Sequence, residues 1–277
     1  MLSQWECFLQ NIGEWQGSFT QISPEGKQIK DTPTVCIFEE PDNNQTVRQL
    51  LRRLPPNQPP QDKYYEYREF GDNILFFEDG SFSIGATVCN QFSRAWAELG
   101  LKEGYRRLRL VQVFNYQNCL ESLTLIREKF AGTDTPERPP LTLEQLLGTW
   151  QGEAIQLTPG LSSTKTVSTN LSLSLQGENK LYQELTFGTE SSSQTISSTA
   201  EVGDNQLIFS ESEVPKKILF LPDGASANFP VEVQLGKPFF LEVGWLVKPN
   251  QRRRLIRNYN AQGEWASLVM INEHKTS

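Results

Sequence analysis

The sequence predicts an all-β protein made of two tandem antiparallel β-barrels, each preceded by a short N-terminal helix. Three observations predict it: the chain repeats itself, segments alternate apolar and polar residues, and a proline-rich stretch separates the two copies. Alternation with a period of two is typical of a strand with one buried face. A chain of 277 residues is also long enough for two domains that each bury a core.

The internal repeat is clearest where each copy begins. Residues 12–17 read IGEWQG and residues 147–152 read LGTWQG, and the similarity continues into residues 21–24 and 156–159. Later blocks match in the same order: residues 74–80 with 218–224, 98–100 with 242–244, and 107–123 with 252–268. Because the register drifts by only about ten positions across these blocks, the repeat indicates a tandem duplication.

The boundary between the copies is a stretch without apolar periodicity, residues 132–140, which read GTDTPERPP. Prolines lack a backbone donor and favour extended conformations, which suits a linker. We therefore expect a first barrel over residues 1–131, a Pro-rich linker over 132–140 and a second barrel over 141–277.

Each copy is predicted to begin with a short helix. Ser3–Glu6 and Thr142–Gln145 both fit a capping box, in which the first and fourth residues cap each other. In the first copy, apolar residues at helical spacing make one stripe: Trp5, Phe8, Leu9 and Ile12. Helix signals are otherwise few, so the remainder of each copy is expected to be sheet.

Strand signals dominate that remainder. Residues 171–175 read LSLSL, and residues 108–114 and 122–126 have a similar character, with a turn between them at 115–118. The second copy repeats this turn at 260–263. Many short strands favour a closed barrel because closure leaves no sheet edge to aggregate, and about eight strands leave room for one small ligand.

Glycines surround a tryptophan at the start of each copy: Gly13, Trp15 and Gly17 in the first, Gly148, Trp150 and Gly152 in the second. This pattern resembles the Gly-x-Trp signature of lipocalins and their relatives in the calycin superfamily. The tandem arrangement is similar, over both copies, to an uncharacterised tandem lipocalin-like family found chiefly in cyanobacteria. The resemblance implies a lipocalin-like barrel in each copy, with the tryptophan closing one end.

The resemblance also implies that an arginine from a late strand packs across each tryptophan. Arg109 and Arg254 match that role by position, and Arg107 and Arg252 are the alternative. The chain departs from secreted lipocalins because its cysteines offer no disulfide pair that fits their pattern. An extracellular carrier role therefore does not transfer.

The same four arginines are candidates for ligand binding. The two arginines of each copy share a strand face, and if that face points into the barrel, their guanidiniums can grip a carboxylate. Bulky residues nearby are candidates for a cavity wall: Trp96 and Tyr105 in the first copy, Phe240 and Trp245 in the second. We favour a structural interpretation of the arginines because both copies keep them. Each would then stack on its tryptophan or pair with an acidic residue, Glu98 or Glu242.

Composition excludes several other functions. Acidic residues outnumber basic ones by 33 to 26, and the net charge of −7 argues against nucleic acid or an anionic membrane as partner. No run approaches the roughly 18–20 apolar residues of a membrane-spanning helix. The start of the chain lacks the basic region of a secretory signal, and the four cysteines are widely spaced. We therefore expect a cytoplasmic protein with free thiols.

Enzyme and cofactor signatures are missing from the sequence. The one histidine, His274, is expected to be a solvated residue rather than a haem ligand, a metal ligand or a catalytic base. Phosphate-loop, dinucleotide-binding, esterase and metalloprotease motifs are absent. We therefore predict no cofactor and no metal site, and we favour a function other than catalysis.

Three functions remain open. The first is binding or carriage of a small, mainly apolar ligand with an acid group in a barrel cavity. The second is a lyase or chaperone of bilin (tetrapyrrole) attachment, by analogy with cyanobacterial bilin lyases that resemble single barrels of this superfamily. The third is a structural or protein-interaction module whose barrels are filled by their own side chains. Filled barrels should hold no cavity above the roughly 300 Å³ that small-molecule sites need.

Overall fold

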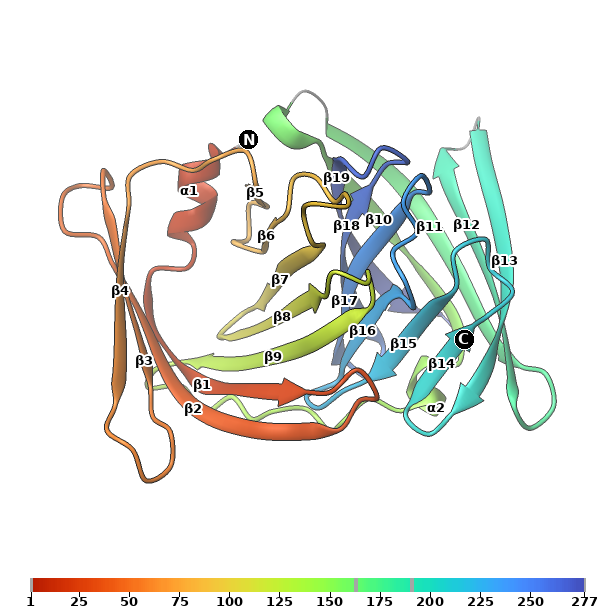
Figure 1. Cartoon of the computed structure of the whole chain (residues 1–277), viewed down its shortest axis with the longest axis horizontal. Helices are drawn as coiled ribbons and strands as arrows, with labels where there is room; N and C mark the ends of the chain where they lie inside the picture. Colours follow the sequence, from red (N-terminus) through yellow and green to blue (C-terminus); the bar gives the residue numbers. More distant parts are fainter. Residues whose placement is uncertain (1, 162–163, 190–191, 277) are drawn as a thin grey trace. The chain divides into compact units, whose positions relative to one another are not determined.

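The computed structural model describes residues 2–161, 164–189 and 192–276. It confirms the predicted fold class, since the described chain forms two antiparallel sheets, each after a short helix (Figure 1). The chain divides into two compact units: Met1–Gly85, Trp96–Val113 and Glu121–Glu137 in the first, and Ala86–Ala95, Phe114–Leu120 and Arg138–Ser277 in the second. In the part of the chain that the structure describes, no helix has the length and apolar character needed to cross a membrane.

The first unit begins with α1 and continues into a curled sheet whose strands lie in the order β4-β3-β2-β1-β9-β8-β7-β6-β5 (Figure 1). The elements are α1 (Gln4–Leu9), β1 (Gly13–Ile22), β2 (Gln28–Glu39), β3 (Val47–Arg53), β4 (Gln61–Tyr67), β5 (Ile74–Phe76), β6 (Phe82–Gly85), β7 (Trp96–Glu103), β8 (Arg106–Phe114) and β9 (Leu120–Phe130). Within the described residues β4 and β5 are the two edges of this sheet. The first sheet therefore stays open, where the sequence predicts a closed barrel.

Aromatic side chains fill the seam between β4 and β5. The ring centroid of Phe8 on α1 lies 5.5 Å from that of Tyr67 on β4, 4.9 Å from that of Phe70 and 5.4 Å from that of Phe76 on β5. The predicted helix stripe is confirmed for Trp5, Phe8 and Leu9, whereas Ile12 packs against the same core from beyond the end of α1. The predicted capping box of α1 also forms, from Ser3 and Glu6. The seam is thus held by packing instead of by a hydrogen-bond ladder.

The second unit contains a closed barrel, in which the strands follow chain order from β10 to β19 and β19 pairs with β10 (Figure 1). Its elements in the described residues are α2 (Leu143–Leu146), β10 (Gly148–Leu157), the 3-10 turn η1 (Pro159–Leu161), β11 (Thr164–Leu175), β12 (Lys180–Thr189), β13 (Ser192–Gly203), β14 (Gln206–Phe209), β15 (Lys216–Phe220), β16 (Ala225–Pro230), β17 (Phe239–Lys248), β18 (Gln251–Tyr259) and β19 (Trp265–Lys275). At the α2 end, Leu146 and Trp150 are part of its buried core.

One glycine of each signature allows two strands to approach closely. A Cβ atom at Gly17 would lie 1.8 Å from the carbonyl oxygen of Arg127 on β9, and one at Gly152 would lie 2.1 Å from that of Asn272 on β19. No side chain fits at such distances. The two glycines therefore permit the close pairing of the first and last strands in each unit.

Candidate ligand-binding site

Both signature tryptophans are fully buried at the start of their units. Trp15 is 1% exposed and Trp150 is 0% exposed. Each indole N–H donates to a backbone carbonyl, that of Trp15 to Asn11 at 2.9 Å and that of Trp150 to Leu146 at 2.8 Å. Because a buried indole N–H needs such an acceptor, these hydrogen bonds fix the orientation of both rings.

Arg107 and Arg252 are the arginines that cover these rings. Their Cζ atoms lie 4.5 and 4.9 Å from the ring centroids of Trp15 and Trp150, within the cation–π range. The pair placed first by position, Arg109 and Arg254, does not stack there. These two residues lie two positions further along the strand, which moves a side chain of the same face by more than 6 Å.

One buried carboxylate, that of Glu128, joins the two arginines in the first unit. Arg107 Nε donates to Glu128 Oε2 at 2.8 Å, and Arg109 Nη2 donates to Glu128 Oε1 at 3.0 Å. Arg109 Nη1 also donates to Glu98 Oε1 at 2.6 Å, so the predicted Glu98 pairing is present. Both arginine side chains and Glu128 are at most 10% exposed.

The second unit repeats this network. Arg252 Nε donates to Glu273 Oε2 at 2.7 Å, and Arg254 Nη1 lies 3.2 Å from Glu273 Oε1. Arg254 also grips Glu242 through Nε at 2.6 Å and Nη2 at 3.1 Å, as the structural interpretation expects. The four arginines are therefore partnered within the protein.

The network sets the charge states of its members. Burial by itself would raise the pKa of Glu128, but Arg107 and Arg109 outweigh burial and hold that pKa at about 2. In the same way, burial opposes the shift while Arg252 and Arg254 hold the pKa of Glu273 below its usual range. Both carboxylates are thus fixed in the ionised form at neutral pH.

Glu128 and Glu273 were missed as candidates, although the repeat contains them. The register that aligns Arg107 with Arg252 also aligns Glu128 with Glu273. An acidic residue kept at the same position of the last strand in both copies was the signal that could have found them.

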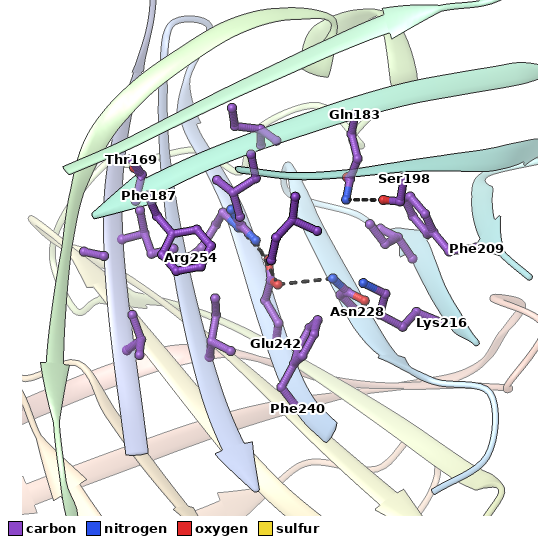
Figure 2. Close-up of a pocket in the computed structure, with 18 of the residues that line it drawn as sticks. Thr169, Gln183, Phe187, Ser198, Phe209, Lys216, Asn228, Phe240, Glu242 and Arg254 are labelled. Carbon is purple, nitrogen blue, oxygen red and sulfur yellow. Dashed lines mark hydrogen bonds and ion pairs between the residues drawn. The ribbon is translucent and has the colours of Figure 1, made fainter. Parts of the chain in front are cut away.

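The second barrel encloses a cavity of about 990 Å³ (Figure 2). Its wall is mainly apolar and includes Leu171, Leu173, Leu185, Phe187, Leu207, Phe209, Ile218, Phe240, Ile256, Val269 and Ile271. The cavity runs from Leu146 at the α2 end to the exposed Glu211 and Glu213 between β14 and β15. Its volume suits a small-molecule site, so the filled-barrel interpretation is wrong for this unit.

Lys216 on β15 is a partly buried cation in the lining of this cavity. Its Nζ atom lies 5.5 Å from the ring centroid of Phe209 and 5.4 Å from that of Phe240, and it makes no ion pair with any described residue. Desolvation lowers the pKa of Lys216, while Glu242 opposes that shift and Arg254 adds to it. Alternate residues of a strand face the same side of the sheet. Because Lys216 lies two residues before the inward-facing Ile218, this alternation could have predicted that Lys216 points into the cavity.

The structure brings only some of the predicted wall residues together. Phe240 and Arg254 line the cavity (Figure 2). Arg252 also belongs to its lining. Trp96 and Tyr105 are 36% and 60% exposed.

Trp245 and His274 lie outside the cavity lining. The Trp245 indole is fully buried, donates to the carbonyl of Asp223 at 2.9 Å and is covered by Arg138 with Cζ at 4.4 Å from its ring. His274 is exposed, and its ring lies 3.3 Å from the Gln251 amide. Among the described residues, His, Cys, Asp and Glu side chains form no cluster of three that could hold a metal ion.

The fold and the site define an all-β protein with a ligand-sized cavity in its closed barrel. The chain belongs to the DUF3598 family: it is 44% identical to a protein with unknown function of that family from Nostoc punctiforme PCC 73102, whose crystal structure it matches with a TM-score of 0.94 over 100% of both chains. Residues 1–133 match the N-terminal domain of unknown function DUF3598. Residues 137–276 match the C-terminal domain of Biogenesis factor required for ATP synthase 1.

A more distant solved structure is the S-type phycobiliprotein lyase CPES from Guillardia theta. It is 11% identical to the chain, with a TM-score of 0.41, over 48% of this chain and 90% of the lyase. No curated protein sequence matches the chain.

Proposed function

We propose that the second barrel binds a small, mainly apolar molecule that carries an acid group. The observation that carries this proposal is Lys216, an ammonium in the mainly apolar wall of a cavity of about 990 Å³ that makes no ion pair with the residues the structure describes. An acid group of a ligand would supply the missing counter-charge, and the apolar part would displace water from the surrounding wall.

In this proposal the arginines of the cavity do not bind the acid group of the ligand. Arg252 and Arg254 are already held by Glu273 and Glu242, so a ligand carboxylate would have to compete with two buried carboxylates for them. The arginines therefore shape the cavity, and Lys216 is the anchor. The free state of all four cysteines supports the cytoplasmic location that we propose with this function.

A pair of matched ligands tests the proposal. Titration calorimetry with dodecanoic acid and 1-dodecanol should show tighter binding of the acid to the wild-type protein. Lys216→Met should lose about tenfold in affinity for the acid, a typical value for one charge-assisted contact, and should bind the alcohol as before. Lys217→Met is the matched control, because Lys217 is the next residue of β15 and is outside the cavity lining. Wild-type protein that binds neither ligand, or both equally, would overturn the proposal.

The tetrapyrrole alternative is an outcome of the same assay. A bilin such as biliverdin carries two propionate groups, so it would also place a carboxylate at Lys216. Binding of biliverdin with a change in its absorbance, followed by its transfer to an apo-phycobiliprotein, would favour a lyase or chaperone. Binding without transfer would favour a carrier.

A second candidate function comes from the C-terminal family match. Residues 137–276 match a domain named for a biogenesis factor required for ATP synthase, which favours a role in assembling that enzyme. Co-elution of the purified chain with isolated ATP synthase subunits in size-exclusion chromatography would support it. Elution of each component at its own volume would argue against it.

A further inference from the structure

The amide of Asn228 on β16 has a fixed orientation in the cavity. Asn228 Nδ2 donates to Glu242 Oε2 at 3.2 Å, and that carboxylate also receives Nε and Nη2 of Arg254. A carboxylate in this position presents acceptors only, so the amide must turn its NH₂ group toward Glu242. The Asn228 Oδ1 atom consequently points the other way.

That oxygen is a buried acceptor without a donor. Asn228 is 8% exposed, lines the cavity, and its Oδ1 atom has no hydrogen-bond partner among the described residues. An acceptor without a donor is an unfavourable state for a buried polar group. A ligand that donates a hydrogen bond to Oδ1 would satisfy this acceptor on binding.

Asn228 and Lys216 lie close enough to serve one ligand head group. In the pairing of β15 with β16, Lys216 is opposite Pro230 and Ile218 is opposite Asn228. Lys216 and Asn228 are therefore diagonal neighbours on the same sheet face, about 7–8 Å apart or less, and Figure 2 shows Asn228 between Glu242 and Lys216.

A second unpartnered atom in the same wall is less informative. The Oγ1 atom of Thr169 is also buried, lines the cavity and has no partner among the described residues. A hydroxyl can donate or accept, so it does not define the polarity of a ligand. Asn228 Oδ1 can only accept a hydrogen bond, so its partner on the ligand must be a donor.

We propose that Asn228 makes this cavity selective for apolar acids that carry a hydroxyl or amide N–H next to the carboxylate. This inference rests on the proposed function, since the carboxylate is placed at Lys216. The adjacent donor binds Asn228 Oδ1, and the hydrocarbon part lies along the apolar wall. A 2-hydroxy fatty acid has this chemistry, whereas the plain fatty acid of equal chain length lacks only the donor.

Titration calorimetry with racemic 2-hydroxydodecanoic acid and dodecanoic acid tests the inference. The wild-type protein should bind the hydroxy acid about tenfold more tightly, as expected for one satisfied buried acceptor. Asn228→Leu should bind both acids equally. Asn258→Leu is the matched control and should keep the preference, because Asn258 also lines the cavity but donates to Ser267 Oγ at 3.1 Å.

The result also separates this inference from the function on which it rests. If the wild-type protein binds the two acids with equal affinity while Lys216→Met still binds dodecanoic acid more weakly, the selectivity is overturned and acid binding stays in place. Absence of any binding of dodecanoic acid would overturn both. The wild-type comparison needs no variant, so it holds even if Asn228→Leu fails to fold.

Discussion

Glu128 and Glu273 occupy equivalent positions in the two units, and each carboxylate is shared by two buried arginines. In each unit one of these arginines also covers the tryptophan at the start of the unit. The carboxylate thus links the last strand of a unit, through a guanidinium, to its first strand. Buried ion pairs of this kind are costly to assemble and far more costly to break singly.

Removal of one carboxylate should therefore destabilise its unit strongly. We expect Glu128→Gln or Glu273→Gln to lower the free energy of unfolding by about 3–5 kcal/mol, because each leaves buried arginines without their shared counter-charge. Urea denaturation measures the loss. Glu153→Gln, at an exposed position of β10, is the control and should change stability by less than about 0.5 kcal/mol. Equal stability of all three variants would contradict the interpretation.

The same network predicts how stability depends on pH. The pKa of Glu128 in the folded state is about 2, below its ordinary value of 4.5. A depressed pKa stabilises the folded state above pH 4.5, and this contribution is lost as the pH falls from about 4.5 toward 2. The Glu128 carboxyl resonance, followed by NMR, should keep its ionised chemical shift at pH 4. A titration midpoint near 4.5 would contradict the prediction.

A methyl group at either glycine of these close strand pairs should be poorly tolerated. Gly17→Ala and Gly152→Ala place a Cβ atom within 1.8 and 2.1 Å of a backbone oxygen, so the strands must separate. We expect a loss of about 3 kcal/mol or more in the free energy of unfolding. Gly104→Ala is the comparison: it has nothing within 4 Å and φ of +58°, so only about 1 kcal/mol of backbone strain is expected. Similar losses at all three sites would show that close approach is not the cause.

The seam of the first unit should depend on Phe8. Phe8→Ala removes the ring that contacts both β4 and β5, and we expect a loss of about 3–5 kcal/mol. Amide hydrogen exchange should also accelerate along β4 and stay unchanged along β10. Phe92→Ala serves as the control because Phe92 is 82% exposed. Unchanged exchange on β4 in Phe8→Ala would mean that the seam does not rely on this ring.

The repeat made the fold class predictable, because the signature tryptophans and the late arginines recur in register. The open first sheet was harder to predict. Between Gly152 and Ile218 the second copy has about ten more residues than the first has between Gly17 and Ile74, which is room for one further strand. In the sequence, an insertion of this length has the same effect on the alignment of the two copies whether it forms a loop or a strand.

The candidate site was predictable only in part. The arginines were found because they recur, but recurrence alone does not show that Glu128 and Glu273 neutralise them. Lys216 and Asn228 do not belong to the matching blocks, and their importance depends on a cavity that arises from the closure of the barrel. A missing ion-pair partner is a property of the folded chain, so no pattern of residues along the sequence displays it.

The seam between β4 and β5 gives the two units different mechanical behaviour. In the closed barrel each strand is attached along both of its sides, so detaching one strand requires two ladders to break together. Among the described residues, strand β4 pairs only with β3, so tension applied to it would break one hydrogen-bonded pair after another. When the chain is pulled through a narrow pore, as by a protein-unfolding motor, the first unit should unravel at a lower force than the second.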